Sequence, residues 1–295
     1  MDRKDFLKAM ALLPLTLNVM QLKALNQLTS SLRNTETMPV LFLGHGSPMN
    51  AIEENDFVKG FRRISTEIAH PAAILCVSAH WETNGTFVTA MEQPRTIHDF
   101  GGFPKALYEI QYPAAGSPEL AAETSRIVTK ATIEADHSWG LDHGAWSVIK
   151  HLYPKADVPV IQLSLDRTKP PQYHYDLAQE LSSLRRKGVL IVGSGNMVHN
   201  LRMVAWNRLN EDGYGFDWAM EANDMMKKFI EEGNHRDLIN YTAQGQAFRH
   251  AIPTPEHYLP LLYSLALQSK NEEVIIFNDK AVGGAITMTS IKIGR

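Results

Sequence analysis

The sequence has 295 residues, of which 44% are hydrophobic and 21% charged, with a formal net charge of −3. This composition is that of a globular protein with a sizeable core, and no block of lysine or arginine is present to follow a nucleic-acid backbone. A single cysteine, Cys76, excludes an intramolecular disulfide and a cysteine-rich zinc module, and it lies in an apolar run typical of a buried strand.

Residues 1–37 require a separate interpretation. A basic start at Arg3 and Lys4 precedes a short apolar stretch at 9–17, which resembles a degraded twin-arginine export signal. Lys4 replaces the second arginine, however, and no small-x-small cleavage site follows. We therefore favour an extension outside the fold and a cytoplasmic protein, with a periplasmic location as the alternative. Nothing else approaches the roughly 18 apolar residues of a membrane span, so no membrane anchor is expected.

From Met38 onward, short apolar runs that end in glycine, serine or histidine alternate with helical segments. Such runs are typical of buried strands in a parallel or mixed sheet covered by helices. The predicted strands are 39–43, 73–77, 158–163, 189–192, 273–277 and 285–291. The predicted helices are 56–64, 117–131, 173–187 and 218–232.

This alternation predicts an α/β fold with a mixed, largely parallel central sheet flanked by helices. Residues 38–295 contain no linker, repeat or low-complexity tract. We therefore expect a single domain over 38–295.

Three of the predicted strands are followed by a histidine, namely His45, His80 and, after a glycine turn, His199. In open α/β sheets, ligands bind outside the carboxyl ends of the strands. Any one of these histidines could be an ordinary surface or hydrogen-bonded residue. Together, a few imidazoles with an open position are typical of a catalytic zinc, iron, copper or nickel site.

A fourth candidate lies near the C-terminus, where Pro255 could open a helix capped by Thr254. Glu256 and His257 would then lie in its first turn. Adjacent helical side chains point about 100° apart, so we expect only one of the two to reach a metal. His137 and His151 are interpreted as packed residues without a chemical role.

Six segments, taken together and in this order, carry a resemblance to a known family. They are GHGSPM at 44–49, SAHW at 78–81, HDFGGFP at 98–104, LDHGAW at 141–146, GSGNMVHNL at 193–201 and PEH at 255–257. The chain from about Met38 onward resembles the 4,5-DOPA extradiol dioxygenases. These belong to the class III ring-cleaving dioxygenases, which include the catalytic subunit of protocatechuate 4,5-dioxygenase.

The resemblance implies one divalent metal per chain, held by His45, His80 and a third ligand. For that third ligand we choose His257 and keep Glu256 in reserve, because protocatechuate-type relatives use a glutamate there. His199 matches an active-site histidine, either an acid/base or a fourth ligand when substrate is absent. The extension 1–37 is the one departure from the shorter family members.

The resemblance also implies roles for further residues. His143 matches a histidine that faces the substrate, and His98 and Phe103 are candidate contacts to the aromatic ring, although they could merely brace their loop. Trp81 is interpreted as core packing. We expect His199 to accept the proton of a catechol hydroxyl and later return it.

The expected reaction is extradiol cleavage of a DOPA-like catechol by O₂ at a mononuclear non-haem site. Fe(II) is the expected catalytic metal, with Zn(II) readily taken up during purification. The expected partners are the small catechol and O₂, with no nucleic acid, in a monomer or homodimer. Two alternatives stay open: a zinc-dependent hydrolase on the same scaffold, and a non-catalytic protein that binds small aromatics.

Overall fold

The computed structural model describes residues 37–295, which belong to one compact unit. The interpretation of residues 1–37 as an extension or degraded signal therefore falls almost wholly outside the described residues. Within 37–295, no helix has the length and apolar character needed to cross a membrane.

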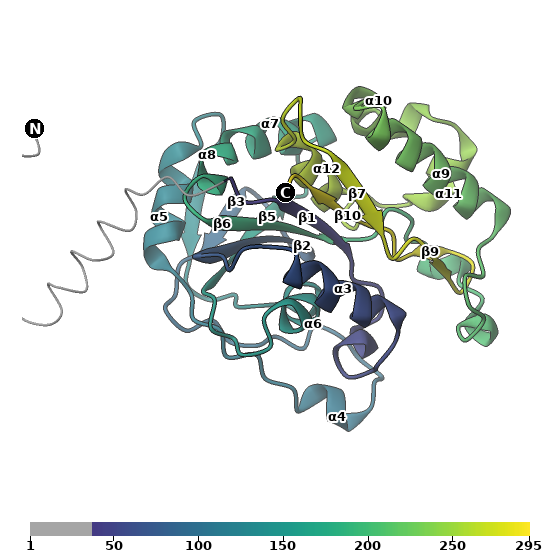
Figure 1. Ribbon diagram of the computed structural model, residues 1–295, viewed down its shortest axis with the longest axis horizontal. Helices are drawn as coiled ribbons and strands as arrows, with labels where there is room; N and C mark the ends of the chain where they lie inside the picture. The colour runs from purple at the N-terminus through teal and green to yellow at the C-terminus, as the bar shows by residue number, and fades with distance from the viewer. Residues whose placement is uncertain (1–36) are drawn as a thin grey trace, which may run out of the picture. The chain divides into compact units, whose positions relative to one another are not determined.

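An eight-stranded sheet forms the centre of this unit, with the strand order β4-β3-β5-β2-β6-β1-β10-β7 (Figure 1). The four middle strands β5, β2, β6 and β1 run parallel, whereas β10 and β7 are added antiparallel at one side. The predicted α/β fold with a mixed, largely parallel sheet in one domain is confirmed. The strands are β1 (Val40–Gly44), β2 (Ala73–Thr83), β3 (Thr86–Thr89), β4 (Ile133–Asp136), β5 (Val160–Asp166), β6 (Val189–Gly195), β7 (Val274–Phe277) and β10 (Ser290–Ile293), with β8 (Ala281–Val282) and β9 (Ile286–Thr287) as a separate pair.

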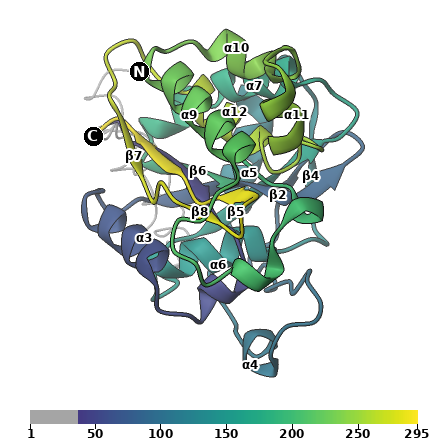
Figure 2. The ribbon, with the colours of Figure 1, turned by 90° about the vertical axis from the view of Figure 1, so that its right-hand side faces the viewer.

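Helices cover both faces of the sheet (Figures 1 and 2). The α-helices are α3 (Asp56–Thr66), α4 (Lys105–Tyr108), α5 (Pro118–Ile127), α6 (His143–Leu152), α7 (Pro171–Glu180), α8 (Ser182–Arg185), α9 (Asp217–Glu231), α10 (His235–Ile239), α11 (Gln246–Ala251) and α12 (Leu259–Ala266). Short 3₁₀ turns occur at η1 (Pro48–Ala51), η2 (Leu201–Met203), η3 (Trp206–Arg208) and η4 (Tyr241–Ala243).

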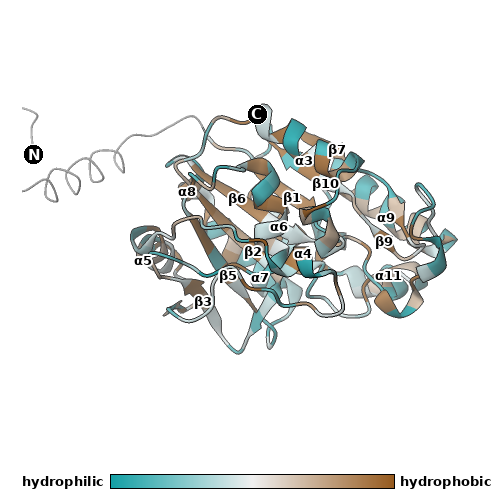
Figure 3. Ribbon diagram, turned by 90° about the horizontal axis from the view of Figure 1, so that it is seen from below, coloured by the Kyte–Doolittle hydropathy of each residue, from teal (hydrophilic) through white to brown (hydrophobic). Residues whose placement is uncertain are grey.

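Two hydrophobic cores lie on opposite faces of the sheet, because successive side chains of a strand point to opposite sides. On β1, Val40 and Phe42 join the core beneath α7, α9, α11 and α12, whereas Leu41 and Leu43 join the core beneath α3 and α6. Figure 3 shows the resulting apolar band along the central strands. This burial on both faces explains why these strands are continuously apolar in sequence.

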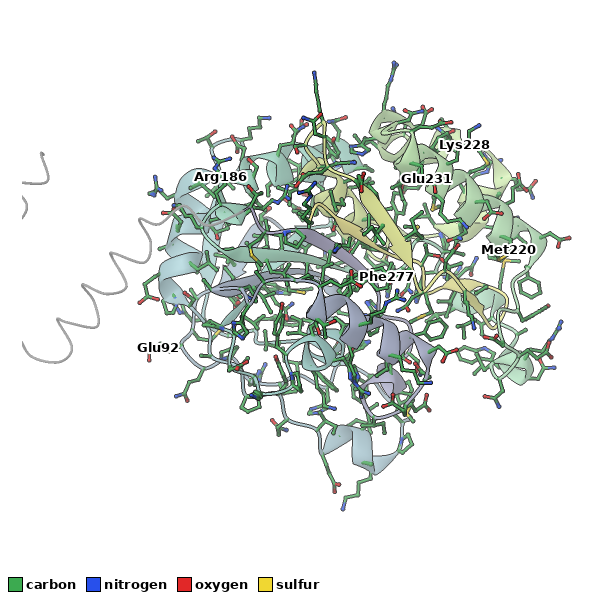
Figure 4. All side chains as sticks on the ribbon, viewed as in Figure 1. Glu92, Arg186, Met220, Lys228, Glu231 and Phe277 are labelled. Atoms are coloured by element: carbon green, nitrogen blue, oxygen red, sulfur yellow. The ribbon has the colours of Figure 1, made fainter. Side chains whose placement is uncertain are left out.

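The covering helices are amphipathic, and α9 illustrates the pattern. Ala222 and Met226 are buried in the core, whereas Lys228 and Glu231 are exposed on the outer side of the helix. Figure 4 shows the two charged side chains there, and Phe277 at the end of β7 in the interior.

Two predicted elements are divided in the structure. The helix predicted over 173–187 is interrupted at Leu181, whose backbone N–H bonds to Ala178 O, three residues back, so the chain tightens and continues as α8. The strand predicted over 285–291 becomes β9 and β10, because the backbone at Met288 turns to bond Lys280.

The prediction of a helix that begins at Pro255 is wrong. The Thr254 hydroxyl donates to Glu256 Oε1 at 2.8 Å instead of capping a helix, and residues 253–258 form bends and turns. Helix α12 begins only at Leu259, where Pro260 occupies the first turn. The sequence contains two prolines that suit a helix start, and the second one is used.

Candidate metal centre

The carboxyl ends of β1, β2 and β6 lie at one edge of the sheet, since these strands are parallel. His45 follows β1 directly, and its N–H bonds to Gly195 O at the end of β6. His80 lies near the end of β2, beyond the residues that pair with β6. His199 follows β6 and forms an isolated bridge with Ile286. All three predicted strand-end histidines therefore reach the same edge.

Three imidazoles converge there into a cluster that could hold a metal ion, formed by His45, His80 and His257. Their potential ligand atoms lie within 4.8 Å of one another. The ring centroids form a nearly equilateral triangle, with separations of 5.0, 5.2 and 5.1 Å. Two segments distant in sequence from His257 thus meet it at one point.

Hydrogen bonding fixes which nitrogen of His45 carries the proton. The Ser194 hydroxyl donates its only hydrogen to Gly144 O at 2.5 Å. His45 Nδ1, 3.0 Å from the same hydroxyl oxygen, must therefore be the donor in that contact. Nε2 of His45 is left unprotonated, with a lone pair directed into the cluster.

A carboxylate lies beside Nδ1 of each of the other two imidazoles. His257 Nδ1 is hydrogen-bonded to Glu256 Oε1 at 3.2 Å, which leaves its Nε2 bare. His80 Nδ1 lies 3.3 Å from Asp99 Oδ2, so a metal ion bound at Nε2 of His80 would leave the proton of that ring on Nδ1, beside the carboxylate.

The donor set fits a divalent transition metal. Nε2 of His45 and Nε2 of His80 are 3.1 Å apart and hydrogen-bonded. Because Nε2 of His45 is bare, His80 is the donor, and a metal ion would take the place of that proton. Burial holds the pKa of His45 and of His257 well below the usual range, and burial followed by the positive field of His143 lowers the pKa of His80 to about 3. The imidazoles are therefore neutral, as metal ligation requires.

Helix α6 delivers a fourth histidine, His143, at its first position. Asp142 caps this helix by accepting from Ala145 N at 3.1 Å, and its carboxylate is also bound by the Ser78 hydroxyl at 2.6 Å. The cap anchors the start of α6 to β2, the strand that carries His80. The two rings consequently lie 3.9 Å apart between centroids.

The fifth histidine, His199, lies on the opposite flank of the cluster. Its ring stacks on that of His257, with centroids 3.6 Å apart and planes 9° from parallel. Burial, opposed by the charge of Glu256, lowers the pKa of His199 to about 4. His199, Glu256 and His257 also form a group with potential ligand atoms in mutual reach.

Two glycines permit these close approaches. A Cβ at position 144 would lie 2.7 Å from His80 Cδ2, and a Cβ at Gly195 would lie 2.1 Å from His257 O. Gly144 therefore admits the His80 ring, and Gly195 lets the segment that carries His257 cross the end of β6.

An aromatic loop borders the His143 flank. His98 Nε2 is 3.0 Å from Ile110 O, so this imidazole braces its own loop. Phe103 packs edge-on against Phe100, with centroids 5.4 Å apart. Phe100 in turn contacts the His143 ring at 5.5 Å. Phe103, a predicted substrate contact, is therefore separated from His143 by the ring of Phe100.

Two residues of the HDFGGFP segment, Asp99 and Phe100, border the site although no role was predicted for them. An acidic residue beside a histidine in a glycine-rich loop was the available signal for Asp99. Of the residues interpreted as packing, Cys76 is fully buried and Trp81 stacks on Trp139. His151 Nε2 is 2.7 Å from a main-chain oxygen, and His137 is exposed.

Comparison with known proteins gives consistent matches over most of the chain. The family described as the catalytic LigB subunit of aromatic ring-opening dioxygenase matches residues 39–284. The chain is 44% identical over 261 residues to the 4,5-DOPA dioxygenase extradiol of Escherichia coli K12, covering 87% of this chain and 95% of that protein. It is 34% identical over 257 residues to the protein of the same name from Beta vulgaris, covering 85% and 94%.

A solved structure agrees with these matches. The crystal structure of an uncharacterized protein of Escherichia coli K12 superposes with a TM-score of 0.75 at 38% sequence identity. The match covers 87% of this chain and all of that chain, 100%.

Proposed function

The chain belongs to the family of the catalytic LigB subunit of aromatic ring-opening dioxygenases and is an extradiol ring-cleavage dioxygenase; we propose that it opens a DOPA-like catechol with O₂ at a single Fe(II) ion. The names of the relatives from Escherichia coli and Beta vulgaris support DOPA as the first substrate to test.

The observation that carries the proposal is the convergence of three neutral imidazoles whose potential ligand atoms lie within 4.8 Å of one another. We propose that His45, His80 and His257 hold the metal, and that Glu256 supports His257 through the 3.2 Å contact to its Nδ1. When bound, Fe(II) would supply the Lewis acidity and the redox chemistry towards O₂ that Zn(II) lacks.

The two flanking histidines would handle the substrate. His199 is proposed to take the proton of a catechol hydroxyl and to return it as the ring opens. His143, which shares the proton of its Nδ1 with Asp99 at 2.9 Å, would accept a hydrogen bond from the substrate at its other ring nitrogen. Phe100 and Phe103 would face the aromatic ring and limit access of water.

The partners we propose are the catechol and O₂ alone, with no nucleic acid, for a cytoplasmic monomer or homodimer. Zinc hydrolysis and simple binding of aromatics remain the competing functions. Each predicts that catechol is not consumed together with oxygen.

The test is direct. The purified chain is loaded with Fe(II) under anaerobic conditions and then given air and DOPA, dopamine or caffeate. Oxygen uptake and the yellow absorbance of the semialdehyde are followed together. Coupled oxygen uptake and colour that disappear on chelation would support the dioxygenase, and a missing oxygen signal in fully iron-loaded protein would favour the hydrolase or the binding protein.

A further inference from the structure

Asp99 lies beside two histidines, His80 and His143, to which the proposed function assigns different roles. Its Oδ2 lies 2.9 Å from His143 Nδ1 and 3.3 Å from His80 Nδ1. Its Oδ1 accepts the backbone N–H of His143 at 2.8 Å. The carboxylate therefore accepts from two N–H groups of His143, its ring Nδ1 and the first amide of α6, and it also lies beside His80 Nδ1.

The hydrogen bond to Asp99 places the proton of His143 on Nδ1, because a carboxylate oxygen only accepts hydrogen bonds. Nε2 of His143 is therefore bare. His80 donates through Nε2 to the bare Nε2 of His45. A metal ion bound at Nε2 of His80 would move the proton of that ring to Nδ1, where Asp99 lies at 3.3 Å.

The carboxylate itself is unavailable as a metal ligand in this arrangement. The cluster His80, Asp99 and His143 has the composition of a cation site, but the ring nitrogen of His143 that faces Asp99 carries its proton. A cation there would have to displace that proton. At the Nε2 atoms of His45, His80 and His257, the proton of His80 can instead move to Nδ1, beside Asp99.

We propose that Asp99 is a positioning residue that fixes the tautomer and orientation of His143 and, when Nε2 of His80 holds a metal ion, those of His80 as well. The inference rests on the proposed function for the task of each histidine, whereas the contacts themselves do not depend on it. By coupling the two rings, Asp99 holds the substrate-facing imidazole in register with a metal ligand. The loop 98–104 thus contributes to the site through its carboxylate as well as through its aromatic rings.

The isosteric variant Asp99→Asn discriminates this role from simple packing. An asparagine side chain keeps the shape but presents one oxygen and one NH₂ group. Either the backbone N–H of His143 or its ring N–H would then face an NH₂ group. One of the two hydrogen bonds is lost in either orientation, so Asn cannot reproduce the contacts of Asp.

The first measurement uses the zinc-loaded full chain with ¹⁵N-labelled histidine. Long-range ¹H–¹⁵N spectra distinguish protonated from bare ring nitrogens, and the His143→Gln variant assigns the His143 signals. We expect Nδ1–H with bare Nε2 at His143 in the wild type. A wild-type His143 protonated at Nε2 would overturn the proposal, whether or not any variant folds.

The second measurement is zinc affinity by competition with a chelator, since loss of a residue that orients a ligand weakens metal binding by about 10–100-fold. We expect Asp99→Asn to show that loss together with a changed tautomer at His143. The matched control is Asp157→Asn, which removes an exposed carboxylate 3.8 Å from His70, outside the cluster. A folded Asp99→Asn chain with wild-type tautomers and affinity would refute the proposal.

Turnover separates this inference from the proposed function. If the iron-loaded wild type fails to open any catechol, the proposed function is wrong, yet the spectra and the zinc affinity still decide the role of Asp99. If the wild type turns over and Asp99→Asn matches it in tautomer, affinity and rate, only the positioning role fails.

Discussion

The two histidines that flank the histidine cluster, His143 and His199, are held in opposite ways. His143 begins a capped helix and is bound by Asp99 at both its ring and its main chain. His199 lies in an irregular segment after β6, and its ring has no hydrogen bond to any residue of 37–295; it stacks flat on His257 instead. One imidazole is fixed by a carboxylate, and the other is held by stacking alone.

This difference suits a division of labour. A ring locked by a carboxylate has one tautomer and one orientation, which favours recognition of a substrate at a set position. A stacked ring without a fixed partner can gain or lose a proton at either nitrogen without breaking an existing hydrogen bond. The geometry therefore supports His143 as the orienting group and His199 as the group that moves a proton.

The largest effect on metal binding and turnover is expected for substitution of the proposed metal ligands, which lie between the two flanking histidines. His45→Ala and His257→Ala each remove one of three proposed ligands, so we expect the chain to lose stoichiometric Fe(II) and Zn(II) binding, and turnover with it. Metal content after gel filtration measures this directly. Near-UV circular dichroism of the metal-free chains checks that folding is intact.

His235→Gln provides the control, since this partly buried histidine bonds Tyr175 and Gln268, neither of which belongs to the cluster. It should bind metal as the wild type does. Retention of one metal per chain in His257→Ala would remove that residue from the ligand set and transfer the third position to Glu256.

The next effect compares the flanks themselves. His199→Ala should lower kcat by about 10²–10⁴-fold, the usual contribution of a general acid/base, while zinc affinity and KM stay close to those of the wild type. His143→Ala should raise KM and also weaken zinc binding, because the Asp99 carboxylate then lacks one of its ring partners. Steady-state oxygen uptake and chelator competition measure the two patterns.

An exchange of the patterns would reverse the assignment. If His143→Ala lowers kcat alone and His199→Ala changes KM and metal affinity, the fixed ring moves the proton and the stacked ring orients the substrate. Equal losses in both variants would show that the two histidines act as one unit.

Most of the sheet could be predicted from sequence, because strands buried on both faces are continuously apolar. The run at 189–192 is an example, and its extension to Gly195 became visible only through pairing with β1. The strands β3 and β4 were both missed. In β4, Glu134 and Ala135 are exposed and leave no apolar run. Strand ends also predicted the edge at which His45, His80 and His199 gather.

The support of the site was beyond the reach of sequence. Whether Asp99 faces His80 depends on how a loop folds back over β2, and no local pattern encodes that path. The Pro255 error has the same origin, since Thr254 bonds the Glu256 carboxylate and a later proline begins the helix. Residue types and strand ends predicted which histidines gather at the site, whereas tertiary contacts determine their tautomers.

A smaller effect is expected on the His199 flank from Glu256→Gln. Glutamine keeps an acceptor for His257 Nδ1 but removes the charge, so we expect zinc affinity to fall by about 10-fold, the lower end of the range for residues that support a ligand. Complete loss of metal would instead identify Glu256 as the third ligand. Glu82→Gln, which removes a more exposed neighbouring carboxylate, is the matched control.

The smallest effect on turnover, none at neutral pH, is expected for a buried histidine remote from both flanks. His174 bonds Tyr263 through Nδ1 at 3.1 Å, and its Nε2 has no partner among residues 37–295. Burial, opposed by the charge of Asp166, lowers the pKa of His174 from 6.5 to about 4. Because the folded pKa lies below the unfolded one, protonation of His174 favours the unfolded chain. The free energy of unfolding therefore keeps its full value above pH 6.5 and decreases by up to about 3 kcal/mol as the pH falls towards 4. The free energy of unfolding, measured with urea on the metal-free chain at several pH values, should therefore fall less steeply with acid in His174→Gln than in the wild type. Parallel curves would show that the acid sensitivity arises from other groups, the histidine cluster included.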